Sequence, residues 1–200
     1  MNIIVRQSFW SSIVIYIGVV LGFVNSIILF PQFLSTEQIG IVRQLISAAT
    51  LLIPITTFGV NASYVKFYPN FVDDKSQKNQ FFIYELTVIL LSYCVVFAFL
   101  NLFYEDIRGL FTEKSRILFN YFDVFLLILF CLSISTLFES FLRARYDTVI
   151  TNIVNGVSNR ILTALTLILF SISLINFDEF INYQAVIYAF GLFILLTYAN

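Results

Sequence analysis

Long apolar runs alternate with short polar segments along the whole chain. Residues 10–30, 45–65 and 86–104 each contain no charged side chain. A helix rises about 1.5 Å per residue, so about 20 apolar residues are enough to cross the hydrocarbon core of a membrane. The pattern predicts six membrane-spanning helices, over residues 9–31, 41–65, 82–104, 117–142, 148–175 and 180–199.

The segment FPQFLSTEQIGIVRQLIS, residues 30–47, separates the first two apolar runs. Pro31 has no amide hydrogen and therefore suits a helix end. Ser35 and Gln38 have the spacing of a capping box, in which two side chains satisfy the free amides at the start of a helix. We therefore expect a tight elbow between the first and second helices.

Composition supports a membrane location. The chain is 60% hydrophobic and 12% charged, whereas a soluble domain carries about 25% charged residues to cover its surface. A secretory signal peptide does not explain the first run, because no small-residue cleavage site follows it and further apolar runs do. The predicted fold class is an all-α integral membrane protein, a six-helix bundle that forms one lobe over residues 1–200.

The basic residues favour a cytoplasmic N-terminus. In that orientation more of them lie inside than outside, as the positive-inside rule requires. Arg6, Lys66, Lys75, Lys78, Arg143 and Arg145 fall inside, and Arg43, Arg108, Lys114 and Arg116 fall at or beyond the outer face. The net charge of −1 and the absence of a basic stripe predict no nucleic-acid partner.

The sequence excludes several kinds of chemistry. It contains no histidine, which rules out Ser-His-Asp and Cys-His nucleophile systems and histidine-based metal sites. Cys94 and Cys131 lie within predicted spans without metal-ligand spacing, so we expect them to be packing residues. No glycine-rich phosphate loop occurs. We expect neither an enzyme active site nor a metal or cofactor.

Polar residues form a stripe on two of the predicted helices. At about 100° per residue, the stripe of the second helix falls within an arc of about 80° and that of the fifth within about 140°. The first stripe comprises Arg43, Ser47, Thr50, Pro54, Thr57 and Asn61, and the second comprises Thr148, Asn152, Asn155, Gly156, Asn159, Arg160, Thr163 and Thr166. Such side chains are costly when they face lipid, so both stripes should point into the bundle.

Each stripe is compatible with helix packing or with a polar cavity. For Ser47, Thr50 and Thr57 packing is favoured, because small hydroxyls cost little when buried. Gly18 and Gly22 likewise have the spacing of a helix-packing pair.

Arg160 favours a cavity, because a guanidinium near the middle of a span needs a partner, water or an anion. The predicted substrate-binding residues that line this cavity are Arg43, Asn61, Asn152, Asn155, Asn159 and Arg160. The acidic residues Glu85, Asp123 and Glu139 lie near predicted helix ends. We expect interfacial solvation or a basic partner for them rather than a cation site.

Several segments resemble a known family. The basic N-terminus, the elbow LSTEQIG and the segment FGVNASYVKFYPNF resemble the start of the polysaccharide-biosynthesis flippases. These are the Wzx-like, O-antigen-transporting branch of the multidrug/oligosaccharidyl-lipid/polysaccharide exporter superfamily. The segment LRARYDTVITNIVNGVSNRILTALTLIL resembles the passage from the fourth to the fifth helix of that family. The resemblance implies the N-terminal lobe of a MATE-type transporter, so a C-terminal lobe is expected to be absent from this chain.

The resemblance also implies a function. Such proteins move polyprenyl-pyrophosphate-linked oligosaccharide between leaflets of the bacterial inner membrane during cell-surface polysaccharide or lipopolysaccharide biosynthesis. Arg43 and Arg160 would attract the pyrophosphate, and the Asn and Thr side chains would bind sugar hydroxyls. The implied partners are the lipid-linked oligosaccharide, the bilayer, and a second lobe or glycan-assembly machinery.

Three alternatives stay open. A cation-coupled drug exporter of the same fold would need a carboxylate in the cavity, and the sequence offers no persuasive one. The chain could also be a membrane scaffold or a truncated remnant without transport. A polytopic glycan transferase is the weakest alternative, because acid and base residues are lacking.

Overall fold

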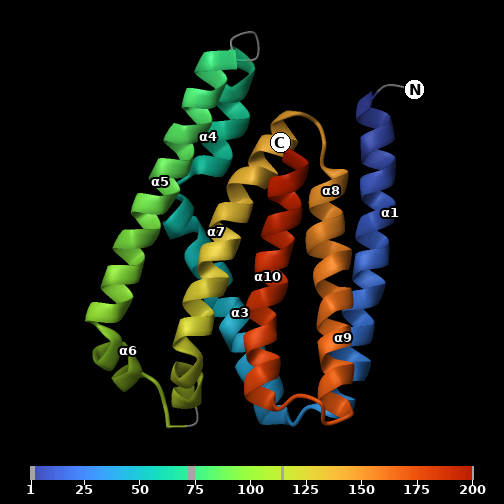
Figure 1. The fold of residues 1–200 in the computed structure, drawn as a ribbon, viewed down its shortest axis with the longest axis vertical. Helices are drawn as coiled ribbons and strands as arrows, with labels where there is room; N and C mark the ends of the chain where they lie inside the picture. The colour runs from blue at the N-terminus through green and yellow to red at the C-terminus, as the bar shows by residue number, and fades with distance from the viewer. Residues whose placement is uncertain (1–2, 72–74, 114, 200) are drawn as a thin grey trace.

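Six long helices run up and down in a bundle, as Figure 1 shows. The computed structural model describes residues 3–71, 75–113 and 115–199, and no strand occurs among them. Six helical segments are long and apolar enough to cross a membrane: Val5–Phe33, Thr36–Thr57, Ser76–Leu102, Ser115–Ala144, Val149–Ser171 and Phe177–Ala199. The predicted class, an all-α membrane protein with six spans, is confirmed.

The spans are built from the following elements. The first comprises α1 (Ile3–Phe23), the π-helix η1 (Val24–Leu29) and α2 (Phe30–Phe33). The second is α3 (Thr36–Thr57), and α4 (Val60–Phe67) and the 3₁₀-helix η2 (Tyr68–Phe71) follow it. The third is α5 (Lys75–Leu102), and the short α6 (Tyr104–Leu110) comes next. The fourth span comprises the 3₁₀-helix η3 (Ser115–Tyr121) and α7 (Phe122–Ala144). The fifth comprises α8 (Val149–Asn152), the π-helix η4 (Ile153–Ser158) and α9 (Asn159–Ser171). The sixth is α10 (Phe177–Ala199).

The predicted elbow between the first two spans is confirmed. The Ser35 amide donates to Gln38 Oε1 at 2.9 Å, and the Gln38 amide donates to Ser35 Oγ at 3.2 Å. Both halves of the capping box are therefore present at the start of α3. Leu34, in an extended conformation, ends the first span and allows the chain to reverse.

The second span ends earlier than the sequence pattern predicts. A continuous helix over residues 41–65 was expected, but α3 stops at Thr57, and Phe58 and Gly59 have φ angles of 47° and 82°. Two successive left-handed residues cannot continue a right-handed helix, so α4 starts in a new direction. Pro54, one turn before the break, already lacks an amide donor. The break removes Asn61 from the helix face that carries Arg43.

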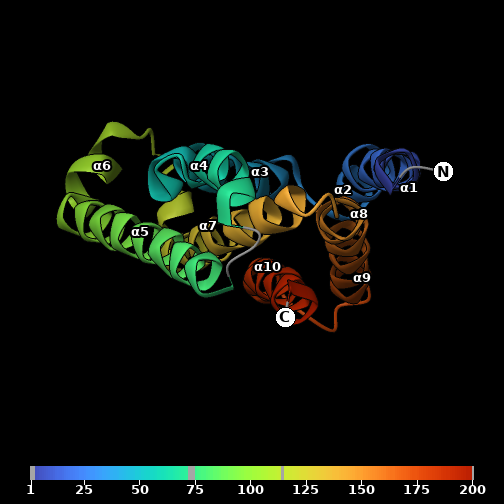
Figure 2. The same cartoon turned by 90° about the horizontal axis from the view of Figure 1, so that it is seen from above.

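Helix α7 occupies the centre of the bundle. It contacts α3, α4, α5 and α10, and the view from above in Figure 2 shows it between α3 and α10. Two polar contacts fix it, one against α3 and one against α4. Ser133 Oγ lies 2.7 Å from Thr56 Oγ1, and Ser140 Oγ donates to Asn61 Oδ1 at 2.6 Å. Small hydroxyls therefore join these helices across the bundle, which is the packing role expected of such residues.

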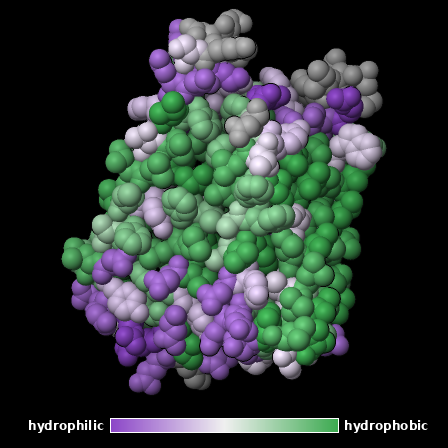
Figure 3. Space-filling view, viewed as in Figure 1, coloured by the Kyte–Doolittle hydropathy of each residue, from purple (hydrophilic) through white to green (hydrophobic). Residues whose placement is uncertain are grey.

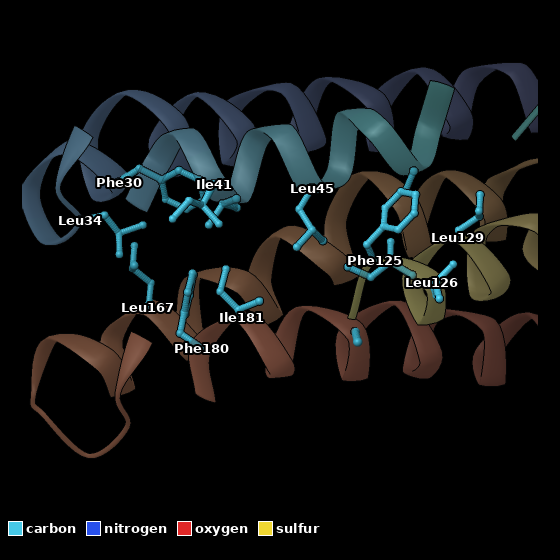
Figure 4. Packing of buried hydrophobic residues seen from close by; sticks show 14 residues of the cluster. Phe30, Leu34, Ile41, Leu45, Phe125, Leu126, Leu129, Leu167, Phe180 and Ile181 are labelled. Atoms are coloured by element: carbon cyan, nitrogen blue, oxygen red, sulfur yellow. The ribbon is translucent and has the colours of Figure 1, made fainter. Parts of the chain in front are cut away.

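An apolar cluster fills the interior near the elbow. Figure 4 shows side chains of α2 and α3 facing those of α7, α9 and α10. The labelled members are Phe30, Leu34, Ile41, Leu45, Phe125, Leu126, Leu129, Leu167, Phe180 and Ile181. A second cluster, with Tyr64 and Phe141 among its buried residues, packs α4 and α5 against α7. Both apolar clusters thus include residues of α7.

The surface has the polarity expected of a membrane protein. In Figure 3 apolar side chains cover the middle of the visible face and hydrophilic ones gather at both ends. The start of α1 and the end of α10 lie at the same end of the molecule (Figure 1). Two expected connections are only partly visible, because residues 72–74 and Lys114 fall outside the described residues.

Candidate functional site

A cavity of about 820 Å³ lies between η1, α3, α7, α10 and the fifth span. Of the six predicted substrate-binding residues, four line it: Arg43, Asn155, Asn159 and Arg160. Asn61 and Asn152 do not line it. Asn61 instead accepts the hydrogen bond from Ser140, as the break after α3 dictates. The structure therefore brings together the basic side chains of two helices that are far apart in the sequence.

Arg160 is held against the first span. Its Nη1 donates to the backbone carbonyl of Gly18, and its own backbone carbonyl accepts from Asn25 Nδ2 at 2.8 Å. Gly22 makes room for the guanidinium, because a Cβ built there would lie 2.7 Å from Arg160 Cζ. A guanidinium has five N–H donors. Among the described residues Arg160 has no carboxylate partner. The salt bridge found there joins Arg108 and Glu105.

The fifth span delivers three polar side chains next to Arg160. Asn155 lies in the π-helix η4, and Asn159 and Thr163 follow in α9. The π-helix inserts one extra residue into the turn, a feature that often occurs at functional sites. Thr163 Oγ1 donates to the backbone carbonyl of Asn159 at 2.8 Å. Asn159 Oδ1 is buried and has no hydrogen-bond partner.

Glu139 of α7 faces the same cavity. The sequence suggested that the acidic residues are solvated at an interface or paired with a basic residue. Glu139 is half-buried instead, and its Oε1 accepts from Asn155 Nδ2 at 2.7 Å. Glu85 is also buried, where it accepts from Ser63 Oγ at 2.6 Å. The predicted solvation is wrong for Glu85, because neighbouring helices cover it, whereas Glu139 stays partly exposed.

Gln184 of α10 also lines the cavity, next to Thr163 of α9. Only 2% of its surface is exposed, and its Oε1 lies 3.4 Å from the Thr163 hydroxyl that donates to it. Its Nε2 has no hydrogen-bond partner. Sequence reasoning missed this residue, because a single amide among the apolar residues of the sixth span forms no stripe.

The fold and the cavity define a multi-pass membrane protein with an open cavity between its helices, lined by apolar, polar and charged side chains. The sequence model of a family described as polysaccharide biosynthesis protein matches residues 4–199. The chain therefore belongs to the polysaccharide biosynthesis protein family. No curated protein and no solved structure matched the chain. Membership gives the protein a role in the synthesis or export of a polysaccharide, in a membrane.

Proposed function

We propose that the protein moves a lipid-linked oligosaccharide across the bacterial inner membrane during the biosynthesis of a cell-surface polysaccharide. In this cargo a polyprenyl lipid is joined to the glycan through pyrophosphate. The observation that carries the proposal is the Arg160 guanidinium, which lines the cavity without a carboxylate partner among the described residues. Family membership supports the same conclusion.

The chemistry of the cavity suits such a cargo. Pyrophosphate is anionic and sugars carry hydroxyls, and hydrocarbon excludes both because each unsatisfied polar group costs several kcal/mol there. A guanidinium can bind two phosphate oxygens at once through its planar fork. The amides of Asn155 and Asn159 can donate to sugar oxygens and accept from sugar hydroxyls. The cavity therefore provides a polar route for the part of the cargo that lipid rejects.

The proposal includes an arrangement in the membrane. The N-terminus faces the cytoplasm, and this bundle acts as one lobe of the transporter. Arg43 and Asn155 are exposed at the cavity, so a second lobe or a second copy of the chain would have to cover them from lipid. Rocking of the two bodies would then open the cavity alternately to each side. The chain itself performs no enzymatic step.

The test replaces Arg160 in cells whose surface glycan depends on the full-length protein. We expect the Arg160→Gln variant to lose roughly 10- to 100-fold in export, because a hydrogen bond to a charged group is worth about 1.5–3 kcal/mol. The Arg160→Lys variant should keep part of the activity, since lysine supplies a charge without the fork. Surface glycan and membrane abundance are measured together.

The matched control is Arg116→Gln, which removes an exposed arginine that does not line the cavity and whose Nε donates to the Phe111 carbonyl. It should export normally. Normal export by Arg160→Gln at normal abundance would end the proposal. Low abundance of Arg160→Gln with normal export per molecule would show that its bond to Gly18 is its main role.

Glu139 supports a second candidate function, a cation-coupled exporter of the same fold. Such a protein needs a carboxylate in its cavity, and the structure supplies one at Glu139. Substitution by glutamine keeps an oxygen that can accept from Asn155 but removes the charge. In a cation-coupled exporter, Glu139→Gln should therefore make transport in vesicles independent of an imposed proton or sodium gradient. Transport that still follows the gradient would exclude this carboxylate as the coupling group.

A further inference from the structure

The buried amide of Gln184 has one neighbour at its oxygen and no hydrogen-bond partner at its nitrogen. The Thr163 hydroxyl lies 3.4 Å from Gln184 Oε1 across the interface between α9 and α10, and the single proton of this hydroxyl is shared with the Asn159 carbonyl at 2.8 Å. The amide nitrogen, which carries two N–H donors, has no partner although the side chain is 2% exposed. Buried polar groups in proteins are nearly always satisfied by protein, water or a ligand. Because Gln184 lines the cavity, its missing partner would lie in the cavity.

Asn159, one helical turn before Thr163, carries a free hydrogen-bond acceptor to complement the free donor of Gln184. Its Oδ1 is a buried acceptor without a partner. The absence of a side chain at Gly191 allows the amide to lie this close to α10, because a Cβ built there would be 3.1 Å from Oδ1. The interface between α9 and α10 thus holds one free donor and one free acceptor, both buried, on two residues that line the same cavity. We call Asn159, Thr163 and Gln184 the amide seam.

The amide seam lies directly beside the candidate anion site. Thr163 is three residues after Arg160, and residues at that spacing are neighbours on a helix surface. In the proposed cargo the pyrophosphate is bonded directly to the first sugar. A group held at the seam while Arg160 binds the pyrophosphate would therefore belong to that first sugar.

We propose that the amide seam binds the first sugar of the cargo through a neutral group that presents one acceptor and one donor. Gln184 Nε2 donates to the sugar group, and Asn159 Oδ1 accepts from it. Neighbouring hydroxyls and an acetamido substituent both have this chemistry. The inference rests on the proposed function, because it assigns the sugar-recognition part of the same cavity.

The test measures binding of three lipids to the full-length protein in lipid nanodiscs: polyprenyl pyrophosphate, its glucosyl derivative and its N-acetylglucosaminyl derivative. We expect the wild-type protein to bind at least one sugar-bearing lipid about fivefold or more tightly than the bare lipid, since one neutral hydrogen bond is worth about that factor. Gln184→Met should lose this preference and keep the affinity for bare polyprenyl pyrophosphate. The derivative whose advantage disappears identifies the group that the seam binds.

A second variant and a control complete the experiment. Thr163→Val keeps the shape of the side chain but removes the hydroxyl that orients Gln184, so the preference should fall without vanishing. Gln80→Leu, at an exposed position of α5, should bind all three lipids as the wild type does.

Three results would overturn the inference. A wild-type protein without any sugar preference would indicate that water fills the seam. An equal loss for all three lipids in Gln184→Met would assign that residue a structural role only. Retention of the full preference by Gln184→Met and Thr163→Val would also refute it. Failure of the wild-type protein to bind any of the three lipids would instead overturn the proposed function, and with it the inference.

Discussion

Some buried polar side chains of this bundle bond to neighbouring spans, and others carry free polar atoms. Asn25 and Ser133 form hydrogen bonds to neighbouring spans, and such bonds average about 0.6 kcal/mol in membrane proteins. Asn159 and Gln184 have free polar atoms, and both line the cavity. The first group holds helices together, whereas the second has unused hydrogen-bonding capacity where a cargo would bind. The same residue types thus have different roles according to their partners.

Replacing Asn25 tests the role of the residues that hold helices together. Its Nδ2 donates to the Arg160 carbonyl at 2.8 Å, and only 6% of the side chain is exposed. We expect Asn25→Ala to lower stability by about 1 kcal/mol, since the substitution removes a buried bond between the first and fifth spans. The measurement is thermal unfolding of the purified protein in detergent. Asn101→Ala is the control, because exposed Asn101 bonds to Phe97 of its own helix. Equal losses in the two variants would contradict the assignment.

At the scale of the elements, hydropathy predicted the helices well and their interruptions poorly. Long apolar runs leave no alternative to a spanning helix, and the capping box at Ser35 is a local signal. The break at Phe58 was missed because a bulky residue with positive φ is rare, and Gly59 alone does not specify it. The π-helices η1 and η4 were missed for another reason: they shift the register without changing the apolar character of the run.

The candidate site was predicted only in part, because periodicity groups the residues of one helix but not those of different helices. The fifth span carries a continuous polar face, so Asn155, Asn159 and Arg160 could be grouped from periodicity. Glu139 and Gln184 stand alone on their helices, and only the packing of α7 and α10 against the fifth span brings them to the cavity. Single polar residues acquire a role from tertiary contacts that one helix cannot reveal.

The contact between α1 and η4 depends on glycine. A Cβ built on Gly18 would lie 2.8 Å from the Gly156 carbonyl oxygen, which is backbone and cannot move aside cheaply. We expect Gly18→Ala to cost about 1–3 kcal/mol through overpacking and to weaken the bond from Arg160 to the Gly18 carbonyl. Thermal unfolding in detergent measures the loss.

Gly40→Ala provides the comparison for Gly18→Ala. Nothing lies within 4 Å of a Cβ built on Gly40, which is inside α3. Alanine is favoured over glycine in a helix by roughly 0.5–1 kcal/mol, so this variant should be neutral or slightly more stable. A Gly18→Ala protein as stable as the Gly40→Ala protein would show that the two spans are not in close contact.

At the scale of the whole molecule, the ends of the bundle differ. Where α1 begins, Asp147 Oδ2 accepts from Tyr198 Oη at 2.6 Å, and Ser11 Oγ lies 3.0 Å from Thr148 Oγ1. These contacts join the first, fifth and sixth spans at the end that the basic residues assign to the cytoplasm. Arg43 lies toward the other end, near the elbow. Hydrogen bonds between spans thus join the end where α1 begins, whereas Arg43 lies toward the end that holds the elbow.

Orientation can be tested with two exposed loop residues at opposite ends. Tyr146 lies between α7 and α8, and Thr112 lies between α6 and η3. We introduce Tyr146→Cys or Thr112→Cys into full-length protein that carries Cys94→Ala and Cys131→Ala, and label with a membrane-impermeant maleimide. If the N-terminus is cytoplasmic, the Thr112→Cys protein should react in right-side-out spheroplasts. The Tyr146→Cys protein should react only in inverted vesicles, because the connection between α7 and α8 lies at the end where α1 begins (Figure 1). The reverse pattern would place the elbow in the cytoplasm and would contradict the orientation that the basic residues predict.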